Sequence, residues 1–310
     1  MTTASIATET VPTPTIKRRN PYRGKVWWRY LTAVLAICFA VLPIVWVILA
    51  ALNPLGTISS LSFSIHDFGF DNFRFLFGKH DLSQEVTYNN YPFLHWYRNS
   101  LMLSSIAAVL QVTIGTMSAY AFSRMAFKGR RLSLGGLLLL QMFPSILSFI
   151  ALFLIMQRVG KVFPFMGTGT FAGLIFIYLG GAMGYNTYLL KGFFDTIPRE
   201  LDEAAIVDGA TSNQVFFKII LPLAAPMLAV VMLLSFIGLM NDFILASIFL
   251  TKSDQMTLAV GLRSFISGRY ASNWGVFAAG ALLAALPVVI LFQVLQRYIV
   301  EGLSAGSVKG

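Results

Sequence analysis

Residues 31–52 read LTAVLAICFAVLPIVWVILAAL, a run of 22 residues without a charged side chain. A bilayer core about 30 Å thick requires roughly 20 apolar residues of helix, at about 1.5 Å per residue. Backbone groups in lipid must bond within their own segment, so such a run predicts a helix and not a strand. It is too long for a cleaved signal peptide and has no small-residue cleavage site behind it. We therefore predict a membrane-spanning helix.

Five further stretches of the 310-residue chain meet the same requirement. The six predicted spans are Leu31–Leu52, Leu101–Phe122, Leu132–Gln157, Phe171–Leu190, Leu223–Leu250 and Trp274–Gln296. Charged residues make up only 12% of the chain and hydrophobic residues 56%, whereas an average soluble domain carries about 25% charged residues. The predicted fold class is an all-α integral membrane protein with six transmembrane helices.

The basic residues divide unequally between alternate connecting segments. If the N-terminus lies inside, the inside segments hold 15 of the 23 Lys and Arg residues and the outside segments hold 8. The positive-inside rule then predicts that both termini are cytoplasmic. The net charge of +10 is thereby assigned to membrane edges. Nucleic acid is not an expected partner, since its binding requires basic residues gathered on one solvated face.

The segments outside the spans predict the organisation of the chain. Residues 1–30 are expected to be a disordered cytoplasmic tail that ends in a basic, tryptophan-containing interfacial anchor. Residues 31–310 form the six-span domain. It includes an outer loop (53–100), a cytoplasmic loop (191–222) and a C-terminal tail (297–310). The outer loop is rich in phenylalanine, so we expect it to pack on the membrane mouth or on a partner.

Missing motifs exclude several enzyme classes. The sequence has no Gly-x-x-x-x-Gly-Lys-Ser/Thr phosphate-binding loop, so the chain cannot hydrolyse ATP by that route. It has no His-Glu-x-x-His zinc-protease motif, and its single cysteine, Cys38, excludes an internal disulfide framework and a cysteine-based zinc site. A Gly-x-Ser-x-Gly sequence at residues 302–306 has no histidine after it, and we interpret it as chance.

The cytoplasmic loop over residues 191–222 concentrates the polar chemistry. It carries five acids against three bases, and this negative charge in a basic chain suits docking to a partner. Pro198, followed by acids, favours the start of a helix, and Gly209 favours its end. Thr211 or Ser212 can cap a second helix. We predict a helix–turn–helix across the inner mouth of the spans. On the pattern alone, an amphipathic loop that only covers the membrane surface fits equally well.

The spacing of residues in this loop resembles a known motif. Glu203-Ala204-Ala205, three residues, Gly209, nine residues and Ile219-x-Leu221-Pro222 resemble the EAA motif of ATP-binding-cassette (ABC) importer permeases. The chain also resembles the carbohydrate branch of these permeases, specifically the shorter permease subunit of maltose-type importers. The stretches that carry this resemblance are Asn99–Leu101, Ala119–Arg130, Lys191–Leu201, Asn241–Ala246, Thr257–Leu262 and Gln296–Gly310.

The resemblance implies which residues face a separate ATPase subunit. The EAA loop would form a coupling helix that seats in a cleft of that subunit, with Glu203 in a charge-assisted contact to a base. The implied coupling residues are Glu203, Ala204, Ala205, Asp208, Gly209, Ile219, Leu221 and Pro222. In the C-terminal tail, Glu301, Gly302 and Gly306 would contact the ATPase interface. The alternative for the tail is an ordinary frayed terminus.

The resemblance also implies the partners and the location of the chain. The partners are a second homologous permease, two ABC ATPase subunits that carry ATP and magnesium, and an extracytoplasmic sugar-binding protein that faces the segment Thr251–Asn273. The chain itself would bind no cofactor, catalyse no reaction and lie in the bacterial plasma (inner) membrane among lipid. The substrate would be maltose, a maltooligosaccharide or a related glycoside. An importer for a polyamine or glycerol phosphate, and a membrane receptor or scaffold, are the alternatives.

Polar side chains within the spans are candidates for the translocation path. Asp242 is the only charged residue in the predicted spans. Because an unpaired acid near the bilayer centre costs at least about 2.5 kcal/mol, it must face the bundle or water. Either it lines the path beside Asn241, or it bonds or caps a break in a discontinuous helix. The other candidates are Gln141, Tyr185 and Asn186. Gln141 can alternatively satisfy backbone groups freed by Pro144.

Overall fold

The computed structural model describes residues 27–53, 68–78, 92–181, 183–267 and 273–307, with side chains described as far as residue 299. The described residues form helices joined by turns, and no β-strand occurs among them. The chain divides into two compact units, residues 1–46 and 47–310.

The first unit contains most of α1 (Trp27–Leu52). Its large apolar side chains, such as Phe39, are exposed. An apolar helix with exposed side chains suits lipid rather than water. At its start the Arg29 guanidinium lies 5.6 Å from the centroid of the Trp28 ring. This pairing suits the predicted interfacial anchor, of which residues 1–26 lie outside the described part.

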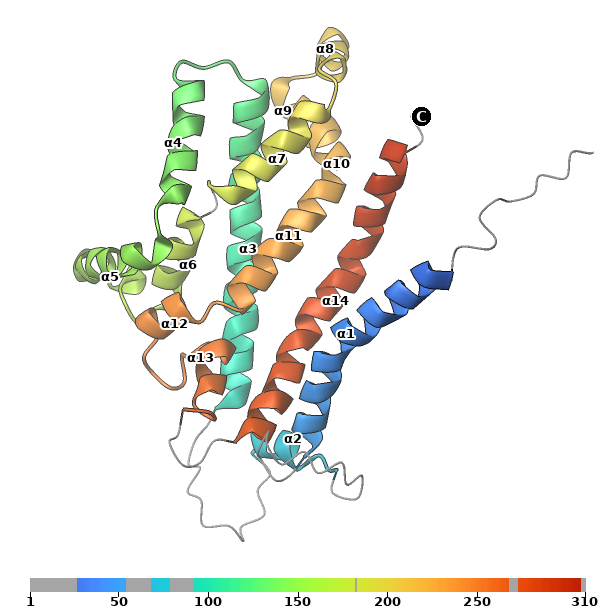
Figure 1. Ribbon diagram of the computed structural model, residues 1–310. Coiled ribbons are helices and arrows are strands. Elements are labelled where there is room, and N and C mark those ends of the chain that lie inside the picture. Colours follow the sequence, from blue (N-terminus) through green and yellow to red (C-terminus); the bar gives the residue numbers. More distant parts are fainter. Residues whose placement is uncertain (1–26, 54–67, 79–91, 182, 268–272, 308–310) are drawn as a thin grey trace, which may run out of the picture. The chain divides into compact units, whose positions relative to one another are not determined.

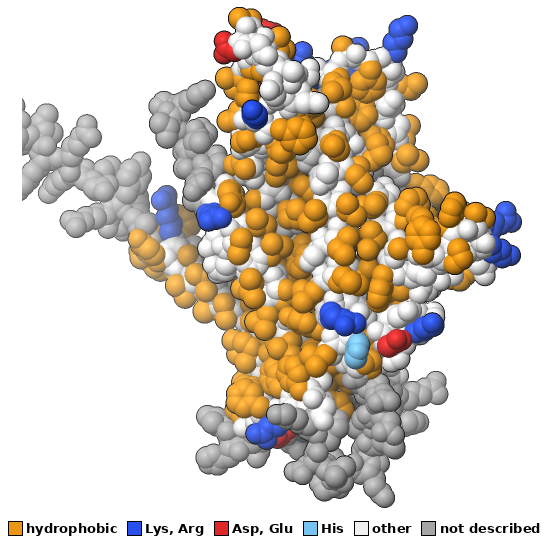
Figure 2. Space-filling view, turned by 180° about the vertical axis from the view of Figure 1, so that it is seen from behind, with side chains coloured by type: hydrophobic (Ala, Val, Ile, Leu, Met, Phe, Trp, Pro, Cys, Tyr) orange, Lys and Arg blue, Asp and Glu red, His pale blue; other side chains and the backbone are white. Residues whose placement is uncertain are grey.

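Helix α3 (Phe93–Arg124) lies at the centre of the second unit. Helices α7 (Tyr185–Thr196) and α11 (Ala225–Met240) pack along it, and α14 (Trp274–Ser307) packs on α11 (Figure 1). Small side chains such as that of Ala119 are fully buried on α3, which allows the neighbouring helices to approach closely. Hydrophobic side chains cover most of the face seen in Figure 2.

The third predicted span, Leu132–Gln157, is broken in the structure. It consists of α4 (Arg130–Met142) and α5 (Ser145–Val162), with Phe143 and Pro144 between them. Proline has no backbone N–H and disfavours a helical conformation in the residue before it, so the helix stops there. A short 3-10 turn, η2 (Pro164–Met166), follows α5.

The fourth predicted span, Phe171–Leu190, is also two helices. Helix α6 (Phe171–Gly180) ends in a glycine-containing turn, and α7 begins at Tyr185. Gly180, Gly181 and Gly184 weaken helix continuation, because glycine loses more backbone entropy than any other residue when it becomes helical.

The fifth predicted span, Leu223–Leu250, divides into α11 and α12 (Ile244–Phe249), with a break at residues 241–243. Short helices precede it: α8 (Glu200–Val207), α9 (Ser212–Val215), the π-helical turn η3 (Phe216–Ile220) and α10 (Leu221–Leu223). The segment Ser212–Leu223 is bent by 74° from α11.

The breaks change the number of continuous spans. Within the described residues, four helices are long and apolar enough to cross a membrane, or five if the bent pair counts as one span. The prediction of an all-α membrane protein is confirmed. The third predicted span is represented among the four by α5 alone, and the possible fifth is α11 with the bent segment Ser212–Leu223 before it. The fourth predicted span, divided into α6 and α7, contributes none among the described residues.

The N-terminal end of α3 corrects the predicted outer loop of residues 53–100, since the helix already begins at Phe93. The indole N–H of Trp96 donates to the Ser253 carbonyl at 2.6 Å, and the Trp96 ring packs so closely on Gly261 of α13 (Leu258–Arg263) that a β-carbon there would clash. Further bonds join the same segments, from Asn99 to the carbonyls of Asp254 and Met256 and from the Leu258 N–H to Ser100.

The described part of the outer loop includes α2 (Asp71–Leu76). Its phenylalanines divide as follows: Phe73 and Phe75 pack against the core that contains Trp96, whereas Phe70 and Phe77 are exposed. Part of the loop therefore packs on this end of the helices, as predicted. Residues 54–67 and 79–91 lie outside the described part.

Candidate functional site

The EAA segment (residues 191–222) begins with the end of α7 and then contains the predicted pair of helices joined by a turn, α8 and α9, before η3 and α10. Helix α8 begins at Glu200, shortly after Pro198, and three acids lie in its first turn. The turn contains Gly209, whose φ is +85°. This left-handed backbone is accessible to glycine at little cost. The predicted helix break is therefore confirmed at the predicted residue.

The second helix of the segment begins with a capping box. The Gln214 N–H donates to the Thr211 hydroxyl at 3.3 Å, and the Thr211 N–H donates to the Gln214 side chain at 2.8 Å. Each side chain thus satisfies a backbone donor of the other residue, which fixes the start of α9. Of the two cap residues considered from the sequence, Thr211 has this role, and Ser212 is the first helical residue.

Helix α8 has two unlike faces. Ala205 is buried in a core formed with α3, α7 and η3. On the opposite face, Ile206 and Val207 are 57% and 87% exposed, and Glu203 and Ala204 are exposed as well. The small size of Ala205 therefore serves packing within the chain, and only Ala204 of the two alanines is available for close approach by a partner. Adjacent exposed apolar side chains are typical of surfaces that bind a partner.

The remaining predicted coupling residues lie in the turn between α8 and α9 and in the segment that follows α9. Asp208 and Gly209 are exposed in the turn. Ile219 packs against the same core as Ala205. Leu221 is half-buried and Pro222 exposed, at the bend that leads into α11. The structure thus places Asp208 at the exposed tip and Ile219 at the foot of the segment.

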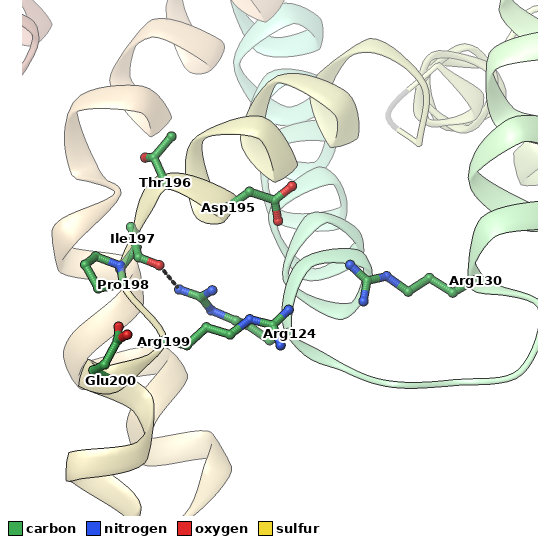
Figure 3. A pocket seen from close by; sticks show the side chains of 8 residues that line it. All are labelled: Arg124, Arg130, Asp195, Thr196, Ile197, Pro198, Arg199 and Glu200. Carbon is green, nitrogen blue, oxygen red and sulfur yellow. Dashed lines mark hydrogen bonds between the residues drawn. The ribbon is translucent and has the colours of Figure 1, made fainter.

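An arginine at the end of α3 holds the EAA segment in place. The Nε atom of Arg124 lies 2.8 Å from a carboxylate oxygen of Asp202 in α8, and its Nη2 atom donates to the Ile197 carbonyl at 2.8 Å. Figure 3 shows Arg124 reaching from α3 to the linker between α7 and α8. The Arg124 and Asp202 side chains are only 7% and 15% exposed, so this ion pair is largely shielded from water.

Two further arginines meet at the same place. Arg199 and Arg130 both donate to the Ser123 carbonyl, at 3.1 Å and 3.4 Å. They line an open pocket of about 520 Å³ together with Arg124 and residues 195–200. Because each of these guanidinium groups already has a protein partner, the pocket is a junction between α3, α4 and the α7–α8 linker.

The acid of this junction is Asp195. Its carboxylate accepts hydrogen bonds from the Ser123 hydroxyl at 2.6 Å and from Lys191 at 2.5 Å. Burial by itself raises the pKa of the Asp195 carboxyl. The hydrogen bonds from Lys191 and Ser123, with the charges of Lys191 and Arg130, outweigh burial and hold this pKa below its ordinary value of 3.8. Asp195 is therefore ionised at neutral pH.

Asp242 lies at the break between α11 and α12. Its carboxylate accepts hydrogen bonds from the Tyr178 hydroxyl at 2.7 Å and from the Ala246 N–H, in the first turn of α12, at 2.9 Å. Asp242 thus caps a helix in a discontinuous span, one of the two roles considered from the sequence. Its neighbour Asn241 is exposed and donates to the Ile237 carbonyl at 3.0 Å. A role of either residue in translocation stays a prediction.

The other candidates for the path lie around the break between α6 and α7. Gln141, at the end of α4, packs over Gly184, where an added β-carbon would lie 3.0 Å from the Gln141 amide carbon. Tyr185, the first residue of α7, is exposed. Asn186 is buried and donates to the Ser235 hydroxyl at 3.0 Å, which joins α7 to α11. Gln141 therefore lies next to the start of α7, where Tyr185 is exposed. Asn186 is instead buried between α7 and α11.

The three predicted tail residues Glu301, Gly302 and Gly306 belong to α14, whose backbone is helical as far as Ser307. Their side chains lie outside the described part, so their predicted contact with an ATPase stays a prediction.

A comparison with protein families identifies the chain. Residues 111–304 match the family described as "Binding-protein-dependent transport system inner membrane component". This match covers more than half of the chain, including the whole EAA segment. The chain belongs to this family. It is a transport component of a membrane and not an enzyme.

Relatives in this family match 73–93% of the chain. Three of them are named maltose/maltodextrin transport system permease protein MalG. The relative from Photorhabdus laumondii subsp. laumondii is 40% identical over 289 residues, 91% of this chain and 97% of the relative. The relative from Vibrio vulnificus is 44% identical over 227 residues, 73% and 75%. The relative from Escherichia coli K12 is 37% identical over 290 residues, 93% and 97%.

Two solved structures share the fold. One is a chain of a bacterial ABC transporter involved in the import of the acidic polysaccharide alginate. It has a TM-score of 0.69 at 23% identity and covers 89% of this chain and 98% of that chain. The other is from the alginate transporter in complex with an alginate pentasaccharide-bound periplasmic protein, with a TM-score of 0.62 at 17% identity, covering 87% and 93%. At these identities the likeness establishes the permease fold alone.

Sequence reasoning about this family member missed the residues that hold the site together. Arg124, Ser123 and Asp202 act through contacts between distant parts of the chain, and Tyr178 through a contact with Asp242. The useful signal for Arg124 was its position directly after an apolar run and opposite an acidic loop. In the described part of the chain, no three His, Cys, Asp or Glu residues form a group that could hold a metal ion.

Proposed function

We propose that the chain is a permease subunit of an ATP-driven, binding-protein-dependent sugar importer and that α8 transmits the movement of a separate ATPase to the membrane helices. The observation that carries this proposal is the exposed apolar and acidic face of α8, which is fixed to the end of α3. The family match supports a transport role. The missing phosphate-binding loop supports an ATPase on another chain.

The exposed face of α8 suits a cleft with basic residues. Ile206 and Val207 are exposed apolar residues, and Glu203 lies one turn before Val207 on the same face of α8. Burial of apolar area contributes about 25 cal/mol per Å², and a glutamate paired with a base adds orientation. The ATPase cleft therefore has an apolar floor and a base opposite Glu203. ATP and magnesium belong to the ATPase subunits, and this chain holds no cofactor.

The proposed topology has six spans with both termini in the cytoplasm of a bacterium. The helix pairs α4–α5, α6–α7 and α11–α12 are spans three, four and five, each broken within the membrane. Such breaks are tolerated where the freed backbone groups are buried in protein or line a cavity. The excess of basic residues on the side of the EAA segment supports this orientation, and the family name supports an inner-membrane location.

The proposed assembly contains this chain, a second homologous permease, two ATPase subunits and an extracytoplasmic sugar-binding protein. The substrate that we propose is maltose or a maltodextrin, because relatives at 37–44% identity carry that substrate in their names. Asn241, Asp242, Gln141, Tyr185 and Asn186 are the proposed residues of this chain near the path.

The experiment is purification of the chain in mild detergent from its own host membrane, followed by mass spectrometry and by uptake of labelled maltodextrin in proteoliposomes. We expect a second permease and an ABC ATPase in fixed stoichiometry, and uptake that requires both ATP and the binding protein. A chain that purifies without an ATPase, at intact expression, would contradict the proposal. An assembly that hydrolyses ATP but imports a polyamine or glycerol phosphate would contradict the substrate alone.

A further inference from the structure

We propose that Arg124 is the positioning residue that couples α8 to α3, through simultaneous contacts with Asp202 and the Ile197 carbonyl. This inference rests on the proposed function, since it names the residue through which a movement of the EAA helix enters the membrane helices. Arg124 is not part of the EAA motif, which begins at Glu203, directly after the Asp202 that Arg124 contacts.

One guanidinium group reaches two elements at once. Its Nε atom is 2.8 Å from the Asp202 carboxylate in α8, and its Nη2 atom is 2.8 Å from the Ile197 carbonyl in the linker before α8. Arginine can make both contacts because its donors are fixed in one plane. The linker before α8 and the first turn of α8 are therefore held to the same point on α3.

The ion pair between Arg124 and Asp202 is largely shielded from water, so its loss should affect the position of α8. Both side chains are mostly covered by protein, at 7% and 15% exposure, unlike the ion pair between Arg74 and Asp71, which is 68% and 63% exposed. Exposed pairs contribute little, because water and salt screen them. Removal of one partner from a covered pair leaves an uncompensated charge, which the surrounding structure must move to solvate.

A second set of hydrogen bonds joins the same elements, and here the arginine donor lies beside α8 and the acceptor lies on α3. Arg199, directly before α8, donates to the Ser123 carbonyl on α3 at 3.1 Å. The Ser123 hydroxyl donates to Asp195 at the end of α7 at 2.6 Å. Arg124 therefore donates from α3, and Arg199 donates from the residue before α8. Together, these bonds resist both rotation and withdrawal of α8 relative to α3.

The position of α3 explains why this link matters for transport. Helix α3 is the central helix, along which α7 and α11 pack. A force on the exposed face of α8 reaches α3 through Arg124, and α3 then moves the helices packed on it as a body. Without Arg124 the ion pair between α3 and α8 is lost, and α3 follows a movement of α8 less closely.

The experiment measures labelled maltodextrin taken up per ATP hydrolysed, with the complete importer and its binding protein in proteoliposomes. The variants are Arg124→Met, Asp202→Asn and the double variant. Matched controls are Arg74→Met and Asp71→Asn, which each remove one partner of an exposed ion pair away from α8. We expect each single variant to lower uptake per ATP by about fivefold or more, the range of typical coupling energies, while ATP hydrolysis continues. The double variant should be no worse than the worse single variant.

Arg124→Lys keeps the positive charge but cannot hold both contacts, and it provides a test if Arg124→Met does not assemble. We expect Arg124→Lys to assemble and still to lower uptake per ATP. Spin labels at Val207→Cys and Met125→Cys, in a Cys38→Ser background, should show a broader distance distribution in both Arg124 variants than in the controls.

Two results distinguish this inference from the proposed function. If Val207→Asp removes the ATPase and abolishes uptake, but Arg124→Lys and Asp202→Asn keep the normal uptake per ATP, the positioning role is wrong and the importer function stands. If uptake and ATPase binding survive Val207→Asp as well, α8 is not the docking helix and the proposed function is wrong too. Additive losses in the double variant would show that Arg124 and Asp202 act separately, which would also overturn the inference.

Discussion

The two ends of α3 are held by different kinds of contact. At the Phe93 end, Trp96 and Asn99 bond to backbone carbonyls of the segment before α13, and the Trp96 ring is buried against Gly261. At the Arg124 end, the contacts are ion pairs and charged hydrogen bonds to the EAA segment. One end is closed by neutral, buried packing, and the other presents a helix whose outer face is exposed.

This difference separates a rigid support from a surface that is available to a partner. Buried packing cannot adjust without loss of stability, because protein interiors are close-packed. Charged contacts hold α8 at the correct place while its apolar outer face stays available. The following predictions compare the two ends, beginning with the largest effect.

Trp96→Ala should damage the Phe93 end most. Removal of a fully buried aromatic side chain costs about 3–5 kcal/mol, and Trp96 is 1% exposed. Thermal unfolding in detergent should shift to a clearly lower temperature, and Val207→Ala at the other end should leave it unchanged. Equal unfolding temperatures for the two variants would contradict the difference between the ends.

Tyr178→Phe tests the break between α11 and α12. The Asp242 carboxylate loses one of its hydrogen-bond donors, and hydrogen bonds to charged groups contribute about 1.5–3 kcal/mol. We expect a lower unfolding temperature in detergent for Tyr178→Phe, and a much smaller change for Tyr185→Phe, since Tyr185 is exposed. A larger loss in Tyr185→Phe would show that the capping contact of Asp242 is unimportant.

Gly209→Val should affect the EAA end alone. A β-branched residue at φ of +85° costs about 1–2 kcal/mol, although a β-carbon at Gly209 has open space around it. Gly209→Asn is the matched control, because asparagine tolerates this backbone conformation. ATPase binding in detergent should be weaker for Gly209→Val than for Gly209→Asn. Equal binding would mean that the turn does not set the position of α8.

The lowered pKa of Asp195 predicts a small effect of pH on the stability of the fold. Its folded-state pKa lies below the ordinary 3.8, so the ionised carboxylate stabilises the fold above that ordinary value, and the contribution is lost as the pH falls through the lowered pKa. Unfolding temperatures of the wild type and Asp195→Asn should differ at pH 6 and converge as the pH falls through the lowered pKa of Asp195. Because the carboxylate is partly exposed, the difference should be small. A difference that grows on acidification would contradict the sign.

The local signals in the sequence were sufficient for the EAA segment. Pro198, Gly209 and Thr211 act on their own neighbours through fixed backbone preferences, so the helix–turn–helix could be predicted. The break near Gly184 was missed, because a glycine run in an apolar stretch is also typical of close helix packing. The start of α3 was missed because His95 and Arg98 interrupt the apolar run.

The Arg124–Asp202 pair could not be predicted from spacing. It joins residues from separate helices, and only the packing of α7 on α3 brings Asp202 to Arg124. Similarly, Asp242 was identified as an acid that needs a partner, but the identity of that partner, Tyr178, depends on how α6 approaches the break. Charge and hydropathy predict that such contacts exist, and the tertiary fold selects which residues make them.

The most direct test of the account is a comparison of crosslinking at the two ends. In a Cys38→Ser background, Val207→Cys and Phe70→Cys each place one thiol at an exposed position, on α8 and beside α2. In the purified importer, a benzophenone maleimide attached to this thiol should, on illumination, join the Val207→Cys chain to the ATPase subunit, and ATP should change the yield. Phe70→Cys should give no such product. An ATPase crosslink from Phe70→Cys, or none from Val207→Cys in an intact complex, would contradict the account.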